Sequence, residues 1–290
     1  MLLGSQFFST RPAQAQAVFP WPAQSAGVER MPTVQASASE PIQVILPPVS
    51  ARNVCPSDLA PAIDRIINQP SYRTAKWGIQ IESLDQQSVL YSHNADAFLI
   101  PASNTKLFTT AAALQAVANR LKSKWKDFDS ELKIVNQNSD NEYADDLLYR
   151  IGGVPTVKAQ MSNLGIPPQA FRQVDGSGLS RQNSTTPATL VTLLKAMRDH
   201  PESEQFYRSL PISGVSGTLK NRFTGTLVQG LVHAKTGTLT GVRALSGYLE
   251  HPVYGSMVFS ILVNQADRGE SLRQGIDEIV TTVGHLRSCP

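Results

Sequence analysis

The order in which helical and β-like periodicities follow one another is the feature that most constrains the fold of this chain. In chain order they are a helical pattern from residue 56, β-like runs at 77–84 and 88–92, a mostly helical block at about 104–200, β-like runs between 231 and 265, and an amphipathic segment at 271–286. One antiparallel sheet drawn from both ends of the chain, flanked by the N- and C-terminal helices and carrying an inserted all-helical lobe, satisfies this order. We therefore expect a mixed α/β (α+β) fold.

The first 52 residues show neither periodicity. Residues 18–53 are rich in Pro, Ala, Gln and Ser and carry little charge, which is typical of a flexible tether. Before them, Ala13–Ala17 resembles the cleavage end of a secretory signal, but the basic segment is missing and the apolar run is short. Either the true start lies upstream or this is a disordered tail.

The predicted organisation is therefore a signal-like remnant and tether at 1–52 and a folded domain at 53–290. Within the folded domain we expect a sheet lobe at about 53–98 and 205–290 and a helical lobe at about 99–204.

Composition excludes several classes of protein. Hydrophobic residues make up 41% and charged residues 17%, as in a folded protein rather than a disordered one. The net charge of +3 is scattered along the chain, so we predict no nucleic-acid partner, and no apolar run reaches the ~18 residues of a membrane span. The two cysteines, Cys55 and Cys289, could form one disulfide or remain two thiols.

Ser103 and Lys106 stand three residues apart where an apolar helical pattern begins. If the helix starts at this serine, both side chains share one face and lie within hydrogen-bond reach. A serine hydroxyl needs a neighbour that takes its proton, and a lysine can do so only when it is neutral. Burial and the positive end of the helix dipole both lower the pKa of a lysine. The pair is a candidate nucleophile and base, although a lone serine here could simply cap the helix.

Two further motifs follow along the chain. The S-D-N run at 139–141 precedes a helical pattern, so its side chains could point into a cleft or could cap the helix. In the strand-like K-T-G run, Lys235 carries a positive charge suited to a carboxylate, and Gly237 would let another backbone approach. Because strand side chains alternate, Lys235 and Thr236 can act together only at an edge or a bulge.

Each motif alone is a modest signal, but S-x-x-K, S-D-N and K-T-G in this order form the set typical of β-lactamases and penicillin-binding proteins. The residues around them resemble the D-alanyl-D-alanine carboxypeptidase/endopeptidase family, the class C low-molecular-mass penicillin-binding proteins, from about Cys55 to the C-terminus. The segments that carry the resemblance are PASNTKLFTTAAAL, NSDNEYADDLL, VDGSGLSRQN, LPISGVSGTLKNRF and HAKTGTLTGVRALSGYL.

The resemblance implies a β-lactamase/DD-transpeptidase-like fold and a serine carboxypeptidase that attacks D-Ala-D-Ala bonds of peptidoglycan. It implies that Ser103 is acylated, that Lys106 is its base, and that Ser139 and Asn141 line the cleft. From their chemistry alone, a serine there could relay a proton and an asparagine could hold a substrate amide.

The same resemblance implies that the third motif binds the carboxylate of the substrate. Lys235 and Thr236 would bind the terminal carboxylate, and the backbone N–H groups of Ser103 and Thr238 would form the oxyanion hole. The loop at 175–180 would lie near the site without an assigned role.

One departure from the family is large: only 32 residues separate Lys106 from Ser139, so the usual accessory domains between the first two motifs are absent. Two alternatives remain open, a β-lactamase that hydrolyses its acyl-enzyme quickly and a non-catalytic binder of peptidoglycan. A Ser-His-Asp hydrolase fits less well, because none of the five histidines lies in a recognisable triad context.

The resemblance also bears on partners and location. We expect peptidoglycan peptide stems as substrate, β-lactams as inhibitors, and a periplasmic or otherwise exported protein. No phosphate-loop or metal-binding signature occurs, so we predict no cofactor and no metal.

Overall fold

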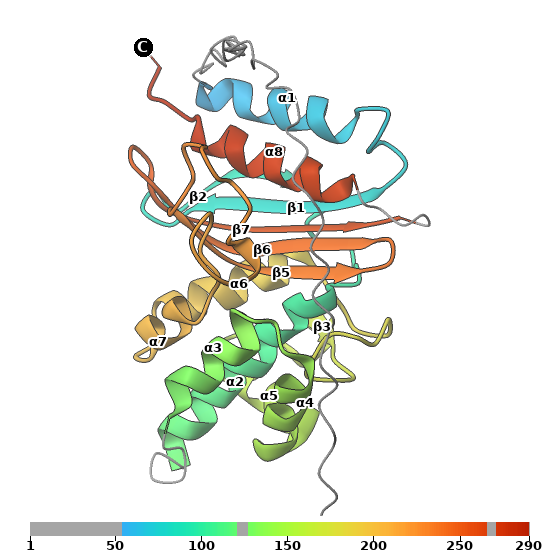
Figure 1. Ribbon diagram of the computed structural model, residues 1–290, viewed down its shortest axis with the longest axis vertical. Helices are drawn as coiled ribbons and strands as arrows, with labels where there is room; N and C mark the ends of the chain where they lie inside the picture. The colour runs from blue at the N-terminus through green and yellow to red at the C-terminus, as the bar shows by residue number, and fades with distance from the viewer. Residues whose placement is uncertain (1–53, 121–126, 266–270, 290) are drawn as a thin grey trace, which may run out of the picture. The chain divides into compact units, whose positions relative to one another are not determined.

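Strands from both ends of the chain form one five-stranded antiparallel sheet, as the order of periodicities predicts (Figure 1). The computed structural model describes residues 54–120, 127–265 and 271–289, so the predicted tether at 1–52 lies outside the described residues. The strand order is β2-β1-β7-β6-β5, which leaves β2 and β5 at the two edges. The strands are β1 (Lys76–Ser83), β2 (Ser88–His93), β5 (Val232–Leu239), β6 (Val242–His251) and β7 (Gly255–Asn264).

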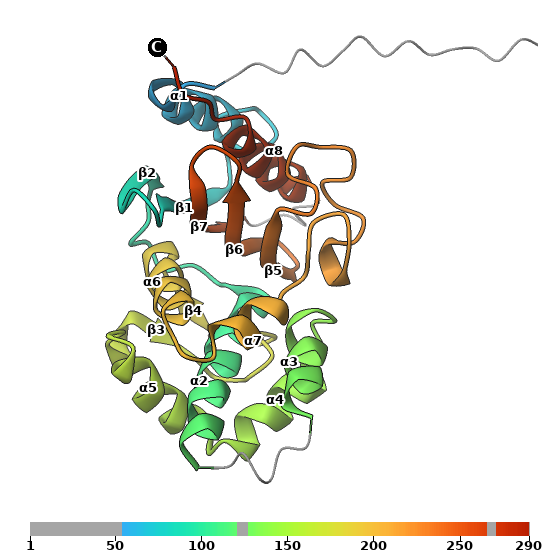
Figure 2. The same cartoon turned by 90° about the vertical axis from the view of Figure 1, so that its left-hand side faces the viewer.

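Helices from the two ends of the chain cover one face of this sheet (Figures 1 and 2). They are α1 (Pro56–Ile67) and α8 (Leu272–Gly284), and the four apolar residues with helical spacing in α1 are all buried, as predicted. Beyond the helix ends, Cys55 and Cys289 form a disulfide with a Cα–Cα distance of 5.6 Å. The bridge joins positions 234 residues apart, so it ties the first helix of the described chain to its last segment.

The central strands are buried on both faces, which explains their nearly continuous apolar sequence. Along β7, Val258 and Leu262 face the helical side, whereas Phe259 and Ile261 pack towards α1 and α8. The sheet therefore separates two hydrophobic cores.

The opposite face of the sheet carries α6 and, beyond it, the helical lobe (Figure 2). Its helices are α2 (Thr105–Arg120), α3 (Phe128–Asn136), α4 (Asn141–Arg150), α5 (Gly153–Asn163), α6 (Pro187–Arg198) and α7 (Ser203–Arg208). Short elements join them: the 3-10 turns η1 (Ala102–Asn104), η2 (Pro168–Ala170) and η3 (Gly217–Leu219), and a two-stranded sheet of β3 (Phe171–Arg172) and β4 (Ser184–Thr185).

The predicted helical block is confirmed, but α3 and α5 were not predicted as separate helices. The side chain of Asp127 caps α3 by accepting from the Ser130 N–H. α5 begins after Gly152, which has a φ of 104°, and carries a proline in its first turn. Within the described ranges, no helix combines the length and apolarity needed to cross a bilayer.

Candidate active site

Ser103 lies on the tight turn η1 that leads into α2, so it precedes the first regular turn of that helix. The preceding residue, Ala102, has a φ of 49°, a left-handed conformation that costs an L-residue roughly 1–2 kcal/mol. Two glycines leave room for this turn. A Cβ on Gly237 would lie 2.5 Å from the Pro101 carbonyl oxygen, and one on Gly178 would collide with the Ala102 carbonyl oxygen. Gly237 of the K-T-G motif and Gly178 of the 175–180 loop therefore lie in close contact with the turn that carries Ser103.

Lys106 is fully buried one turn along, and its ammonium nitrogen has three oxygen neighbours. The Nζ atom lies 3.2 Å from Ser103 Oγ, 2.8 Å from Asn141 Oδ1 and 2.6 Å from the Ser177 carbonyl oxygen. The carbonyl oxygens of Asn141 and Ser177 can only accept hydrogen bonds. A neutral Lys106 that donates to both of them therefore directs its lone pair at the hydroxyl of Ser103.

The electrostatic surroundings make a neutral Lys106 accessible. Burial lowers the pKa of Lys106 from its ordinary value to about 8, although the nearby carboxylates of Asp145, Asp175 and Asp140 act to raise it. An amine with this pKa can exchange a proton with a serine near physiological pH. The geometry and the electrostatics of Lys106 both suit a general base.

The second motif divides its residues between helix capping and the cleft. The Asp140 carboxylate accepts from the Tyr143 N–H at 2.9 Å and caps α4, so the capping interpretation is right for this residue alone. Asn141 reaches Lys106, and Ser139 accepts a hydrogen bond from Lys235 Nζ at 2.8 Å. Ser139 has a φ of 59°, a conformation that non-glycine residues adopt rarely and often at functional sites.

The third motif lies on β5, an edge strand that pairs in regular register with β6. The edge position, rather than a bulge, thus makes it available. Lys235 is fully buried, and besides Ser139 its Nζ contacts the Thr236 carbonyl oxygen at 3.1 Å. Burial and the charge of Lys106 hold the pKa of Lys235 well below its ordinary value. Lys235 therefore does not carry the fixed positive charge that was expected, and its protonation depends on what binds beside it.

Along β5, Thr236 is partly exposed and Thr238 is exposed, whereas Lys235 and Gly237 are buried. Thr236 Oγ1 donates to Thr218 Oγ1 at 2.8 Å. Further up the strand, the Ala234 N–H donates away from β6 to the Pro211 carbonyl oxygen at 3.0 Å. Because backbone groups of a strand alternate in direction, the N–H of Thr238, four residues on, points to the same open side.

The structure also places near the site residues to which the sequence motifs assigned no role. Asn104, the last residue of η1 and the one that follows Ser103, accepts from Ser246 Oγ at 2.7 Å and can donate to the Lys235 carbonyl oxygen at 2.9 Å. The carbonyl of Ser177 completes the surroundings of Lys106 from the 175–180 loop, which was expected nearby without a role. The only hint of this contact in the sequence was the pair of glycines around Ser177.

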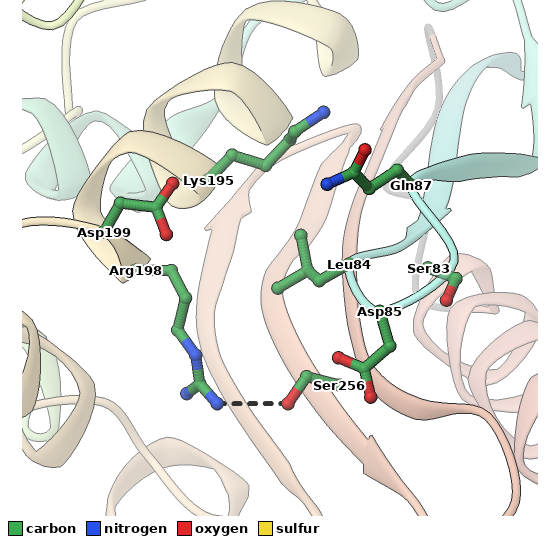
Figure 3. Close-up of a pocket in the computed structure, with 8 residues that line it drawn as sticks. All are labelled: Ser83, Leu84, Asp85, Gln87, Lys195, Arg198, Asp199 and Ser256. Atoms are coloured by element: carbon green, nitrogen blue, oxygen red, sulfur yellow. Dashed lines mark hydrogen bonds between the residues drawn. The ribbon is translucent and has the colours of Figure 1, made fainter.

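Other groups of chemical interest lie elsewhere. His233 stacks on Tyr207 with 4.1 Å between ring centroids. Among the described residues, no group of three or more His, Cys, Asp or Glu side chains is arranged to hold a metal ion. Figure 3 shows a separate cavity of about 440 Å³ between the β1–β2 turn, the end of α6 and the start of β7; it contains no motif residue. Its lining residues are Ser83, Leu84, Asp85, Gln87, Lys195, Arg198, Asp199 and Ser256.

Known structures share this fold. Penicillin-binding protein 4 from Haemophilus influenzae superposes with a TM-score of 0.63 at 14% identity, over 76% of this chain and 98% of that one. A class A β-lactamase from Bacteroides cellulosilyticus superposes with a TM-score of 0.63 at 18% identity, over 80% of this chain and 98% of the other. The predicted fold class is confirmed by both.

Sequence relatives are more similar but longer. Penicillin-sensitive carboxypeptidase A of Dictyostelium discoideum is 36% identical in an alignment of length 162 that covers 49% of this chain and 31% of the relative. A D-alanyl-D-alanine carboxypeptidase of an Actinomadura species is 40% identical in an alignment of length 142 that covers 43% of this chain and 26% of the relative. The matched part thus spans about a third of these relatives or less.

A family-wide comparison covers more of the chain. The sequence model of the D-Ala-D-Ala carboxypeptidase 3 (S13) family matches residues 59–122 and 117–283. The two matches overlap at residues 117–122, between Lys106 and Ser139, where the sequence lacks the accessory domains. Because together they take in more than half of its residues, the chain belongs to the D-Ala-D-Ala carboxypeptidase 3 (S13) family.

Proposed function

We propose that this chain is a serine D-alanyl-D-alanine carboxypeptidase or endopeptidase of peptidoglycan that works through an acyl-enzyme on Ser103. The observation that carries the proposal is the position of Lys106: a buried amine with a lowered pKa whose Nζ lies 3.2 Å from Ser103 Oγ. Two carbonyl acceptors fix its other directions. A serine placed only to cap a helix would not need a buried, triply hydrogen-bonded lysine beside it.

In the proposed acylation step, neutral Lys106 takes the hydroxyl proton of Ser103 while Oγ attacks the carbonyl carbon of the penultimate D-alanine. The N–H groups of Ser103 and Thr238 stabilise the negative charge that develops on the carbonyl oxygen. When the C–N bond breaks, the leaving amine takes up the proton that Lys106 accepted, which returns Lys106 to its neutral form. Ser139, whose Oγ contacts Lys235, would relay this proton to the amine. The products are a free D-amino acid and an ester on Ser103.

Deacylation repeats the chemistry with water as nucleophile. Lys106 takes a proton from the water, which attacks the ester carbonyl, and Ser103 recovers its proton as the peptide carboxylate leaves. During acylation Lys235 and Thr236 would hold the terminal carboxylate, which leaves with the D-amino acid, whereas Asn141 would hold a substrate amide in both halves. A bound carboxylate would raise the pKa of Lys235 and favour its charged form.

We also propose that the protein acts outside the cytoplasm. A disulfide between Cys55 and Cys289 supports this location, because such bonds persist in oxidising compartments. Peptidoglycan peptide stems would be the substrate there, and β-lactams would be inhibitors that acylate the same serine.

Release of D-alanine tests this proposal. The full chain is incubated with a peptide that ends in D-Ala-D-Ala and, in parallel, with the same peptide ending in D-Ala-L-Ala; a cross-linked dimer of stem peptides reports endopeptidase action. We expect release from the first peptide, little from the second and none with Ser103→Ala. Equal turnover of both peptides, or turnover that survives in the Ser103→Ala variant, would contradict the proposed function.

A further inference from the structure

One hydrogen-bond acceptor of Lys106, the Ser177 carbonyl oxygen, is a backbone atom of a loop. Its position depends on the contacts that hold this loop. The Ser177 oxygen lies 2.6 Å from Lys106 Nζ, the shortest of the three contacts of that amine. If this carbonyl moved away, neutral Lys106 could turn one of its N–H bonds towards Ser103, and its lone pair would no longer meet the serine proton. The position of Ser177 therefore decides how the base is oriented.

One carboxylate oxygen fixes that part of the loop. Asp145 Oδ1 accepts from the Gly176 N–H at 2.7 Å and from the Ser177 N–H at 2.8 Å. Successive N–H groups that converge on one anion form a compact backbone nest. Gly176 also lies directly against the Ala144 carbonyl oxygen, where a Cβ would collide. The loop is thus seated on α4 through its own backbone.

α4 supplies both fixed acceptors of Lys106, one directly and one through the loop. Asn141 and Asp145 are four residues apart, so they share a face of the helix. Asn141 contacts Lys106, and Asp145 holds the residue whose carbonyl contacts it. Neither the S-D-N motif nor its family role includes the residue at 145.

We propose that Asp145 is a positioning residue for acylation: through the Gly176 and Ser177 amides it holds the Ser177 carbonyl on Lys106, which leaves the lone pair of the neutral amine for Ser103. The inference rests on the proposed function. Asp145 would contribute in two ways, through the hydrogen bonds that its Oδ1 atom accepts and through its negative charge.

The charge of Asp145 is one of several that face Lys106. Asp145 lies on α4, Asp140 at the start of α4, Asp175 in the 175–180 loop, and Lys235 on β5. Asp145 favours the charged form of Lys106 most among the carboxylates, but it is itself an exposed residue. Solvent screening therefore keeps its effect small, and its loss should move the titration of Lys106 to lower pH.

Three substitutions separate these contributions. Asp145→Asn keeps an oxygen at the Oδ1 position and can accept both hydrogen bonds, but it removes the charge. Asp145→Ala removes both. The matched control is Asp146→Asn on the same helix, because Asp146 pairs with Arg150 at 2.7 Å. The Ala variant should still fold, since the Gly176 carbonyl is also held by Thr109 of α2 at 3.1 Å.

The experiment measures the rate of acylation at saturating fluorescent penicillin from pH 5.5 to 9.5. For Asp145→Asn we expect a plateau within about threefold of the wild type and a midpoint at lower pH than in the wild type. For Asp145→Ala we expect a plateau at least about tenfold lower, as for a misplaced catalytic group, and for Asp146→Asn no change. Wild-type behaviour of Asp145→Ala, or equal loss in the Asn and Ala variants, would overturn the inference.

A second measurement does not depend on acylation. NMR titration of labelled lysine side chains, with the Lys106 signal assigned through Lys106→Arg, follows the base in the free protein. The inference predicts a lower midpoint in Asp145→Asn than in the wild type, and an unchanged midpoint contradicts it. If the wild type is not acylated by penicillin at all, the proposed function fails, while this titration still decides whether Asp145 acts on Lys106.

Discussion

The pH dependence of acylation follows from the burial of Lys106. With a pKa of about 8, about one molecule in ten carries a neutral Lys106 at pH 7, compared with about one in three thousand for a lysine at the ordinary value of 10.5. Burial therefore increases the amount of active base about 300-fold at neutral pH. Below pH 8 the rate should fall about tenfold for each pH unit, and above pH 8 it should level off.

The assay is stopped-flow acylation with a fluorescent penicillin at several concentrations and pH values. The rate constant at saturation reports Lys106, whereas the apparent affinity reports Lys235, which is expected to hold the ligand carboxylate. This separation matters because the two amines influence each other. Lys106→Arg serves as a control, since a guanidinium stays charged and cannot act as a base at these pH values.

Two results would refute this reasoning. A saturating rate that is constant from pH 6 to pH 8 would show that neutral Lys106 is not required. A rate that keeps rising towards pH 10 would show that Lys106 titrates like an exposed lysine, and that its burial does not shift its pKa.

Three further predictions concern other parts of the structure. A carboxylate ligand should bind the Ser103→Ala variant with uptake of a proton and more weakly as pH rises, because the anion raises the pKa of Lys235; calorimetry in buffers of different ionisation enthalpy checks this. Gly178→Ala should lower the acylation rate at least about tenfold, since Gly178 has a φ of 86° and lies against the serine turn. Replacing Cys55 and Cys289 by serine should cost about 3–5 kcal/mol and lower Tm by about 10 °C without changing the acylation rate.

Much of the fold could be predicted because its periodicities are strong. In α1 the apolar residues repeat with helical spacing and carry no competing signal, so their buried face could be read directly. The strands β1 and β2 are separated by a short polar turn. For β5 the sequence left an edge position and a bulge open, and the sheet order decides for the edge. The helices α3 and α5 were harder, because they are short and α5 starts with glycine and proline.

The candidate site could be predicted only where side chains carry the chemistry. Ser103, Lys106, Ser139 and Lys235 belong to short motifs, and the structure links them by hydrogen bonds. The Ser177 carbonyl could not be found in this way, because every residue has a carbonyl and only the path of the loop selects one.

The disulfide between two cysteines far apart in the chain also could not be predicted from the sequence. Whether Cys55 meets Cys289 depends on α1 and α8 packing side by side on one face of the sheet. That packing is a consequence of the sheet order, which places strands from the two ends of the chain next to each other.

Intact mass spectrometry after brief exposure to penicillin tests most directly whether Ser103 is an acylated nucleophile. The proposed mechanism predicts that the protein gains the mass of one penicillin, that the adduct persists for a long time, and that Ser103→Ala gains nothing. Rapid loss of the adduct with consumption of penicillin would indicate a β-lactamase instead. An unmodified wild-type protein with no penicillin consumed would contradict the mechanism and indicate a non-catalytic relative.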